Sequence, residues 1–417
     1  MLGEIIAIGD ELTSGRILNT TSFFAASKLF AAGHEIIAMA TVGDSAAAIE
    51  EALEKALNRA DFVLVTGGLG PTTDDRTNET VSRVLRRPVT LYPEILARIR
   101  ASAAGRDPEA QARLEKLAWL PAGAEVLNPQ ARMAGYLLVH SGKPIFFLPG
   151  VPHEMRELLV ERVIPWLDAW AEDAGKKVGQ RLYKVFGLEE SAINQRLALV
   201  ERDHPRVRIG YYPVFPEVHL SLTAIDEDEA EVERLLAAAG REVEARLAGA
   251  IFGHEGTTMA SEVGRLLGEA KRTLAVAESC TGGLVCQALV RVPGISASFE
   301  GGVVAYSNRL KEQVLAVPVA ILAARGAVSA ETAQAMAQGV RRLAGAHLGL
   351  GLTGIAGPGG GSADKPVGTV YIALAWEGGG EVHRFLFSGD RWQIQELAAH
   401  TGLDLVRRRL LVVRAGA

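Results

Sequence analysis

The stretch TLAVAESCTGGLVCQALVRV, residues 273–292, decides the fold of the C-terminal part of this chain. Its first half has the apolar pattern of a buried strand, and an apolar helical pattern follows the Ser-Cys-Thr-Gly-Gly turn at once. A strand that leads directly into a helix favours an α/β fold, in which ligands bind where the strands end. Ser279 stands at that point, either as the cap of the helix or as an exposed nucleophile.

Two further segments of the C-terminal part also follow apolar strand patterns. The first is TGIAGPGGG, residues 353–361, whose glycines would let main-chain N–H groups converge on a phosphate. No Gly-Lys-Ser/Thr follows it, so it is not a Walker loop. The second is VVAYSNRLKEQVLAV, residues 303–317, which places Tyr306 at a strand exit and Lys311 in an early helical turn. A lysine acts as a base when burial lowers its pKa, and a solvated surface lysine is the simpler alternative.

The pattern along the chain predicts three domains. Residues 1–170 alternate apolar strands with helical patterns, which predicts a parallel sheet covered on both faces. Residues 176–250 hold three strand patterns and two helical patterns, which predicts a small α+β domain after a polar linker at 171–180. Residues 256–417 are expected to form the second large α/β domain.

Composition narrows the class of protein. Hydrophobic residues make up 48% of the 417 residues and charged residues 22%, the balance of a globular protein. The net charge of −5 lacks the basic excess of nucleic-acid-binding domains, so we expect no nucleic-acid partner. No apolar run is long enough for a membrane helix, and the opening MLGEIIAIGD lacks the basic region of a signal peptide. Cys280 and Cys286 are too few for a disulfide framework or a zinc cluster. The low cysteine count, the lack of a long apolar run and the lack of a signal-peptide pattern together favour the cytoplasm as the location.

Three segments rich in glycine and acidic residues follow strands in the N-terminal part. They are AIGDELTSGRILNTTS (7–22), VTGGLGPTTDDRTNET (65–80) and LPGVPHEM (148–155). Because strand ends share one edge of an α/β sheet, we expect these segments to meet. Their amides suit a phosphate, and their carboxylates suit a hard divalent cation; these are Asp10, Glu11, Asp74, Asp75 and Glu154. The alternative for Asp74 and Asp75 is that they cap the helix that begins near Thr77.

The C-terminal motifs AESCTGG, YSNxxK and TGIAGPGGG…KPVGTVY resemble the C-terminal domain of the CinA family, the PncC-type nicotinamide mononucleotide deamidases. The resemblance implies hydrolysis of nicotinamide mononucleotide to nicotinic acid mononucleotide and ammonia, with no cofactor. It makes Ser279 the nucleophile, with Lys311, Tyr306 and Thr353 as the other catalytic residues. The substrate contacts that it implies are Thr281, Gly282, Gly283, Gly354, Gly357, Gly359 and Gly360.

The residue types agree with this chemistry. A serine can form an acyl-enzyme, and a lysine can accept the serine proton and return it to the leaving ammonia. Amides of the Thr-Gly-Gly turn are expected to stabilise the oxyanion. Cys280 as the nucleophile is the alternative.

The N-terminal segments are similar to the molybdopterin-binding fold of the MoeA/MogA type, an α/β sandwich that forms the amino-terminal domain of CinA proteins. The resemblance implies an ADP-ribose pyrophosphatase that releases AMP and ribose 5-phosphate and needs Mg, Mn or Co. The implied metal ligands are Asp10, Asp74 and Asp75, and the implied phosphate or sugar contacts are Asn19, Gly67, Gly68 and Thr72. Binding of a molybdopterin-like ligand without hydrolysis is the alternative.

The middle part resembles the KH-like module of full-length CinA proteins. Its AAAGRE turn lacks a GXXG sequence with basic flanks, so we expect a spacer or a dimerisation role in place of RNA binding. The resemblance also implies a homodimer. We therefore expect a cytoplasmic enzyme with two activities in pyridine-nucleotide salvage. The alternative is an interaction partner in competence and DNA damage, the processes after which the family is named.

Overall fold

The structure, a computed structural model, describes residues 1–72, 75–102, 107–128, 135–170 and 177–415. Asp74 and most of the expected linker at 171–180 lie outside these residues. The chain divides into two compact units, Met1–Gly179 with Ile225–Glu233, and Gln180–Ala224 with Arg234–Ala417. Within the described ranges, none of the helices combines the length and the apolar content of a transmembrane span.

The first unit is built on a mixed sheet with the strand order β2-β1-β3-β8-β7-β6 among the described residues. β2, β1, β3 and β8 run parallel, whereas β7 pairs antiparallel with β8, and β6 pairs antiparallel with β7. The expected parallel sheet is therefore wrong at β7 and β6. Ser141 and Gly142, both with positive φ, join β7 to β8 in a hairpin that is too short for a crossover helix. The strands are β1 (Leu2–Ile8), β2 (Glu35–Val42), β3 (Phe62–Thr66), β6 (Glu125–Val126), β7 (Tyr136–His140) and β8 (Lys143–Leu148).

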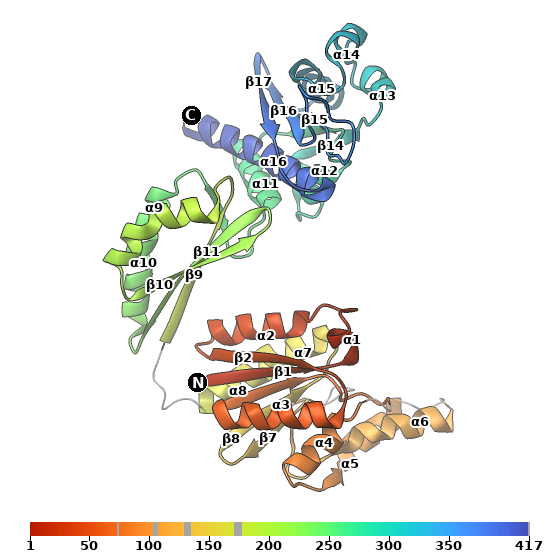
Figure 1. Cartoon of the computed structure of the whole chain (residues 1–417), viewed down its shortest axis with the longest axis vertical. Helices are drawn as coiled ribbons and strands as arrows, with labels where there is room; N and C mark the ends of the chain where they lie inside the picture. The colour runs from red at the N-terminus through yellow and green to blue at the C-terminus, as the bar shows by residue number, and fades with distance from the viewer. Residues whose placement is uncertain (73–74, 103–106, 129–134, 171–176, 416–417) are drawn as a thin grey trace. The chain divides into compact units, whose positions relative to one another are not determined.

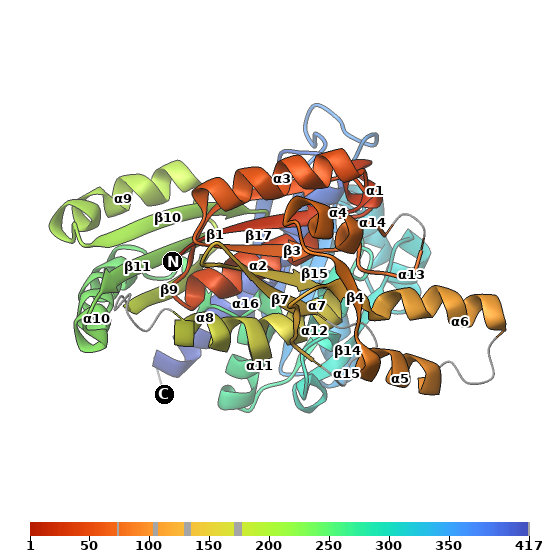
Figure 2. The same ribbon diagram turned by 90° about the horizontal axis from the view of Figure 1, so that it is seen from below.

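Helices cover both faces of this sheet, because alternate strand residues point to opposite sides. Ile6 and Ile8 pack with α3 and α4, whereas Ile5 and Leu64 pack with α2, α7 and α8. Figures 1 and 2 show α2 and α3 on opposite sides of the strands. The helices are α1 (Asp10–Thr13), α2 (Thr20–Ala31), α3 (Ala46–Arg59), α4 (Thr77–Val84), α5 (Pro93–Ser102), α6 (Pro108–Glu115), α7 (Pro152–Leu158) and α8 (Ile164–Trp170), and a ribbon pairs β4 (Val89–Leu91) with β5 (Trp119–Pro121).

The KH-like middle module has the strand order β10-β11-β9-β12. β12 was not expected, because its four residues are too few to show a strand pattern. Phe186 and Phe252 of this module belong to the same buried cluster as the C-terminal domain, so the two parts share a core. The elements are β9 (Lys177–Val185), α9 (Glu190–Asp203), β10 (Val207–Val214), β11 (Glu217–Asp226), α10 (Glu229–Arg246) and β12 (Ile251–His254).

The C-terminal domain is an α/β fold with the strand order β14-β13-β15-β16-β17 in the described chain. β14, β13 and β15 run parallel, β16 pairs antiparallel with β15, and β17 pairs antiparallel with β16. The strands are β13 (Leu274–Glu278), β14 (Phe299–Val304), β15 (Leu348–Gly354), β16 (Thr369–Trp376) and β17 (Gly379–Leu386). The helices are α11 (Met259–Ala270), α12 (Leu284–Val290), α13 (Asn308–Gln313), α14 (Val319–Arg325), α15 (Ala330–Ala344) and α16 (Arg391–Ala415).

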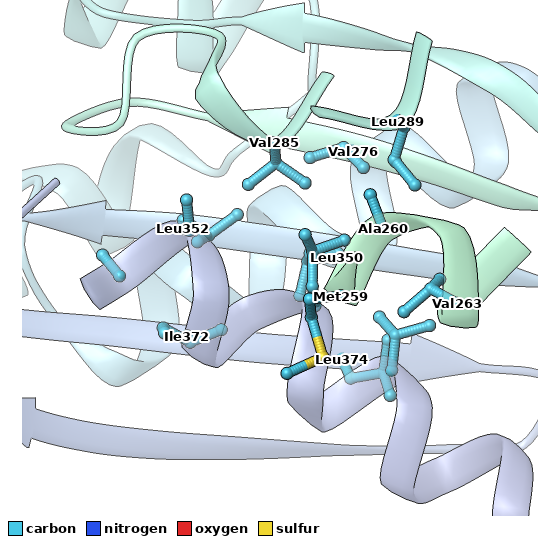
Figure 3. Packing of buried hydrophobic residues seen from close by; sticks show 14 of the residues in the cluster. Met259, Ala260, Val263, Val276, Val285, Leu289, Leu350, Leu352, Ile372 and Leu374 are labelled. Carbon is cyan, nitrogen blue, oxygen red and sulfur yellow. The ribbon is translucent and has the colours of Figure 1, made fainter. Parts of the chain in front are cut away.

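The central strand β15 carries leucines on one face and glycines on the other. Leu350 and Leu352 join the core formed with α11, α12 and α16, where Figure 3 shows Leu350 close to Met259. On the other face, a Cβ added to Gly349 would lie 2.2 Å from a backbone oxygen of α15, and one added to Gly351 would lie 2.5 Å from another. α15 therefore packs directly against the backbone of β15.

Candidate active site

Ser279 and Lys311 meet at the carboxyl ends of two neighbouring parallel strands. Ser279 follows β13 directly, and Lys311 lies in α13, which begins after β14. The Nζ atom of Lys311 lies 2.9 Å from the Oγ atom of Ser279. Lys311 is 1% exposed and Ser279 is 7% exposed, so the pair is largely closed off from bulk water.

The surroundings of Lys311 suit a base. Its Nζ atom also donates to the carbonyl oxygens of Ala305, at 2.8 Å, and Tyr306, at 3.2 Å. Burial lowers the pKa of Lys311 from its ordinary value of 10.5. In the neutral state the amine keeps two N–H groups for the two carbonyls and presents its lone pair to the Ser279 hydroxyl. The solvated surface lysine considered above is therefore wrong for Lys311.

Glu278 was not among the expected site residues, yet its fully buried side chain caps α12. Its carboxylate accepts hydrogen bonds from the amides of Gly283, at 2.9 Å, Val285, at 3.3 Å, and Cys286, at 2.9 Å. A carboxylate at this position satisfies free N–H groups of the helix and its positive dipole end. Ser279 is therefore not the capping side chain.

The capping carboxylate changes what the Thr-Gly-Gly turn can offer to a substrate. The Gly283 amide donates to Glu278, and the Gly282 amide lies 3.2 Å from the carbonyl oxygen of Ser279. The expectation that these amides hold an oxyanion is therefore wrong for Gly282 and Gly283. Both residues have positive φ, so what they supply is the shape of the turn.

Thr281 and Cys280 occupy the same turn. The buried hydroxyl of Thr281 has no hydrogen-bond partner among the described residues. The amides of Cys280 and Thr281 face the Cys280 thiol and have no oxygen acceptor among the described residues. Burial raises the pKa of the Cys280 thiol to about 12, so at neutral pH it is protonated and a poor nucleophile.

Thr353 lies near the end of β15, and Tyr306 lies in the loop between β14 and α13. The buried Thr353 hydroxyl donates to the carbonyl oxygen of Ala327, at 2.8 Å. The Tyr306 ring is 62% exposed, and its hydroxyl accepts a hydrogen bond from Arg391, at 3.3 Å. Tyr306 contacts Lys311 through its carbonyl oxygen.

Arg391 and Lys365 fix the loops near the glycine-rich segment, and neither was expected. Arg391, the first residue of α16, donates to the carbonyl oxygen of Gly357 at 2.6 Å. Lys365 donates to the carbonyl oxygens of Arg325, at 3.0 Å, and Val328, at 2.7 Å. Of the other glycines expected to bind substrate, Gly354 pairs with β16, and Gly359 and Gly360 are exposed.

A tight turn in the N-terminal domain borders a cavity. Gly67 and Gly68 follow β3 with positive φ, and a Cβ on Gly67 would lie 2.2 Å from the carbonyl oxygen of Ile8. The Thr77 hydroxyl donates to the Gly67 carbonyl oxygen, at 3.2 Å. The cavity has a volume of about 280 Å³ and is lined by Gly68, Leu69, Gly70, Asp75, Asn78, Glu79, Val89, Lys116 and Trp119.

Asp75 closes the loop beside this cavity. Its Oδ2 atom accepts hydrogen bonds from the amide of Thr72, at 2.9 Å, and from the Thr72 hydroxyl. Lys116 donates to the carbonyl oxygens of Asp75, at 2.6 Å, and Thr72, at 3.2 Å. The cap position of α4 is Arg76, which makes no side-chain cap, so the alternative that Asp75 caps this helix is wrong.

Asp10 and Asn19 have local hydrogen bonds. The amides of Asp10 and Asp44 each donate to the other residue's carboxylate, at 2.8 and 3.1 Å. Asn19 caps α2 by accepting from the amide of Ser22, at 3.0 Å, and it donates to the Thr41 hydroxyl. Neither Asp10 nor Asn19 is among the described residues that line the cavity. Over the same ranges, no three His, Cys, Asp or Glu side chains are grouped so that they could hold a metal ion.

Three known domain families match this chain in order. Residues 4–169 match "Probable molybdopterin binding domain", residues 180–253 match "Damage-inducible protein CinA KH domain", and residues 256–410 match "CinA C-terminal domain". The expected fold class, an N-terminal molybdopterin-binding-like part, a KH-like middle and a C-terminal α/β part, is thereby confirmed.

Full-length relatives share the same arrangement. A CinA-like protein of Desulfotalea psychrophila is 51% identical over 408 residues, which cover 98% of each chain. A CinA-like protein of Geobacter sulfurreducens is 42% identical, over 97% of this chain and 98% of the relative. A solved CinA superfamily protein of Klebsiella pneumoniae is 35% identical, covers 37% of this chain and 96% of its own, and has a TM-score of 0.36. On the identity shared with its full-length relatives, this chain belongs to the CinA family.

Proposed function

We propose that the C-terminal domain hydrolyses an amide and that its substrate is nicotinamide mononucleotide. The observation that carries this proposal is the contact of 2.9 Å between Lys311 Nζ and Ser279 Oγ, in surroundings that lower the pKa of the lysine. A serine beside a neutral lysine is a nucleophile with its base. The resemblance of the surrounding motifs to nicotinamide mononucleotide deamidases supplies the identity of the substrate.

The proposed reaction proceeds through an acyl-enzyme. Lys311 takes the proton of Ser279 while Oγ attacks the carbonyl carbon of the amide. The protonated lysine then gives this proton to the nitrogen as the C–N bond breaks, and ammonia leaves. Water attacks the resulting ester with Lys311 again as the base, which releases nicotinic acid mononucleotide and restores the serine.

A buried donor without a partner lies next to Ser279 and supports a substrate there. It is the hydroxyl of Thr281, which has no hydrogen-bond partner in the described chain. A buried donor that stays unpaired costs about 1–3 kcal/mol, so this hydroxyl gains from an oxyanion or a carbonyl oxygen of the substrate. We assign the phosphate to the exposed backbone of Gly359 and Gly360.

The test is release of ammonia from nicotinamide mononucleotide in buffer that contains EDTA. Three full-length proteins are compared: wild type, Ser279→Ala and Cys280→Ser. We expect release by wild type and by Cys280→Ser, and none above background by Ser279→Ala. Release by Ser279→Ala that is lost in Cys280→Ser would show that the thiol is the nucleophile. A folded wild type that releases no ammonia would remove the deamidase proposal.

For the N-terminal domain we propose binding of ADP-ribose and its hydrolysis to AMP and ribose 5-phosphate with Mg, Mn or Co. The supporting observation is the cavity of about 280 Å³, where Asp75 and Glu79 supply carboxylates and Lys116 an ammonium group. Asp75 and Glu79 would hold such a cation together with the pyrophosphate oxygens of the substrate, because Mg²⁺ is commonly bound by one or two carboxylates, waters and phosphate oxygens.

The second proposal is tested by release of AMP from ADP-ribose with each cation and with EDTA. We expect release only with added cation, and a large loss in Glu79→Gln. Glu35→Gln is the control, because Glu35 is an exposed acid on β2 away from the cavity. Binding of ADP-ribose or a pterin without release of AMP would instead favour a ligand-binding domain.

A further inference from the structure

The hairpin between β10 and β11 of the KH-like module contacts the first half of α16. The rings of Phe215 and Trp392 lie with their centroids 5.3 Å apart. On the same hairpin, the carboxylate of Glu217 lies 3.4 Å from the Nε2 atom of His400. Trp392 and His400 are separated by about two helical turns, so both lie on one side of α16. The hairpin therefore follows α16 along this side.

The adjacent side of the same helical turns holds the loops of the candidate active site. Arg391 donates to the carbonyl oxygen of Gly357, at 2.6 Å, and to the Tyr306 hydroxyl, at 3.3 Å. Gln395, one turn later, donates to the carbonyl oxygen of Cys280, at 2.7 Å. α16 thus connects the hairpin of the KH-like module with both the glycine-rich loop and the turn that carries Ser279.

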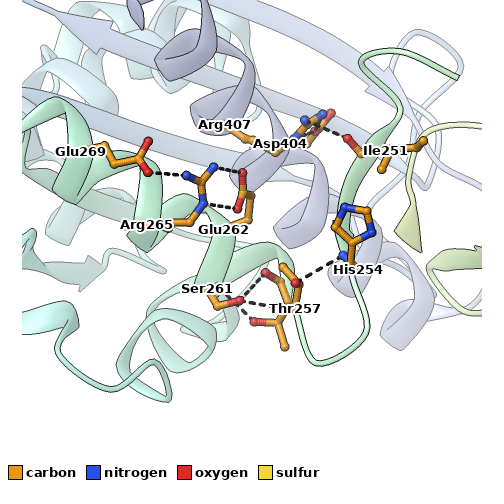
Figure 4. Close-up of polar contacts among 10 residues, drawn as sticks. Ile251, His254, Thr257, Ser261, Glu262, Arg265, Glu269, Asp404 and Arg407 are labelled. Atoms are coloured by element: carbon orange, nitrogen blue, oxygen red, sulfur yellow. Dashed lines mark hydrogen bonds and ion pairs between the residues drawn. The ribbon is translucent and has the colours of Figure 1, made fainter. Parts of the chain in front are cut away.

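The far end of α16 is anchored to the same module by buried polar contacts. Arg407 is 3% exposed and donates to the carbonyl oxygens of Gly249, at 2.6 Å, and Ile251, at 3.4 Å. Asp404 pairs with Arg407, as Figure 4 shows. The contact at the hairpin end is different in kind, because Phe215 is 43% exposed and Trp392 is 56% exposed. The hairpin contact can therefore be weakened without loss of the anchor.

We propose that the KH-like module is a positioning element for the C-terminal active site. Phe215 and Glu217 hold the first turns of α16 in place. Because Arg391 and Gln395 lie on these turns, their hydrogen bonds then fix the positions of the glycine-rich loop and the Ser279 turn. The link to catalysis rests on the proposed deamidase function. Phe215 is a positioning residue, since it reaches the site only through Trp392 and its neighbour Arg391.

The experiment compares full-length Phe215→Ala with full-length Tyr212→Ala. Tyr212 is a matched control, because it is 51% exposed on β10 and its side chain makes no ring contact, ion pair or hydrogen bond among the described residues. The first readout is amide hydrogen exchange of peptides that cover 280–283 and 355–361. The second is the separate measurement of kcat and KM for nicotinamide mononucleotide.

We expect Phe215→Ala to speed exchange in both peptides and to raise KM, each by about three- to tenfold, as loss of one aromatic pair implies. The value of kcat stays within about twofold, because the contact between Lys311 and Ser279 is not altered. Phe215→Tyr, which keeps the ring, restores both readouts, and Tyr212→Ala behaves as wild type.

Equal exchange and equal KM in Phe215→Ala, Tyr212→Ala and wild type would overturn the positioning role. An equal effect of Phe215→Ala and Tyr212→Ala would also overturn it, because the cause would then be general loosening of the hairpin. If wild type releases no ammonia, the deamidase proposal fails, and hydrogen exchange alone still decides whether the module positions the two loops.

Discussion

Replacing Lys311 with methionine tests the proposed base directly. Methionine has a similar length and no proton to transfer, and the site is too closed for water to take the place of the amine, because Lys311 is 1% exposed. Proton transfer by a positioned side chain contributes about 10²- to 10⁴-fold to a rate. Since no water substitutes, we expect the upper part of that range, a loss of about 10³- to 10⁴-fold in kcat. This loss corresponds to about 4–5.4 kcal/mol in the activation free energy.

The pH dependence of the wild type gives a second measure of the same group. Burial places the folded-state pKa of Lys311 below its ordinary value of 10.5, and the neutral amine is the active form. The rate of ammonia release therefore rises with pH through the folded-state pKa and then levels off. Between that pKa and 10.5 the unfolded chain binds more protons than the folded one, so the free energy of unfolding contributed by Lys311 also rises with pH across this window.

The assay is steady-state ammonia release from nicotinamide mononucleotide between pH 6 and pH 10. Lys271→Met is the control, because Lys271 is an exposed lysine of the same domain. We expect this control to keep the wild-type profile. A folded Lys311→Met that retains kcat within tenfold of wild type would refute the role of Lys311 as the base.

Three further substitutions test other parts of the domain. Glu278→Gln keeps the shape of the side chain but turns a donor toward the α12 amides, so we expect urea denaturation to show a loss of about 2–4 kcal/mol in the free energy of unfolding. A loss no larger than that of the exposed control Glu255→Gln would contradict the capping role. Thr281→Val removes an unpaired buried hydroxyl, so stability should hold while KM for nicotinamide mononucleotide rises by about tenfold; Thr281→Ser should restore KM, and an unchanged KM in Thr281→Val would mean that the hydroxyl does not bind substrate. Gly351→Ala places a Cβ 2.5 Å from the backbone of α15 and should lower the free energy of unfolding by about 1–3 kcal/mol. Gly268→Ala, in open space on α11, should raise the free energy of unfolding by up to about 1 kcal/mol. Equal effects of these two substitutions would argue against the close contact.

Much of the C-terminal fold could be predicted, because its strands are apolar runs that end at polar or glycine-rich motifs. TLAVAES and HLGLGLTG became β13 and β15 with almost the expected bounds. Ser279 and Lys311 both follow strands, and β13 and β14 are neighbours, so the geometry of the sheet brings the two residues together.

Other features depend on contacts that a local pattern does not contain. In the sequence, Glu278 looks like the last residue of a strand. Its capping role could not be predicted, because its carboxylate reaches over a turn to amides beyond the usual capping position. Arg391 begins a helix far along the chain from Gly357, whose carbonyl oxygen it contacts. The direction of β7 follows from the two-residue hairpin at Ser141. The apolar pattern of a strand does not indicate this direction, because the pattern is the same for a parallel and an antiparallel strand.

The glycine face of β15 also sets the position of a loop at the end of this strand. α15 sits directly on the backbone of Gly349 and Gly351, and the loop that enters this helix is tied to Thr353 at the end of the same strand. Any side chain on that face would lift the helix and with it the loop. The position of this loop is thus fixed by two residues with no side chains and no role in chemistry. Divergence of substrate size in such a fold is expected to come from the loops and to leave this layer unchanged.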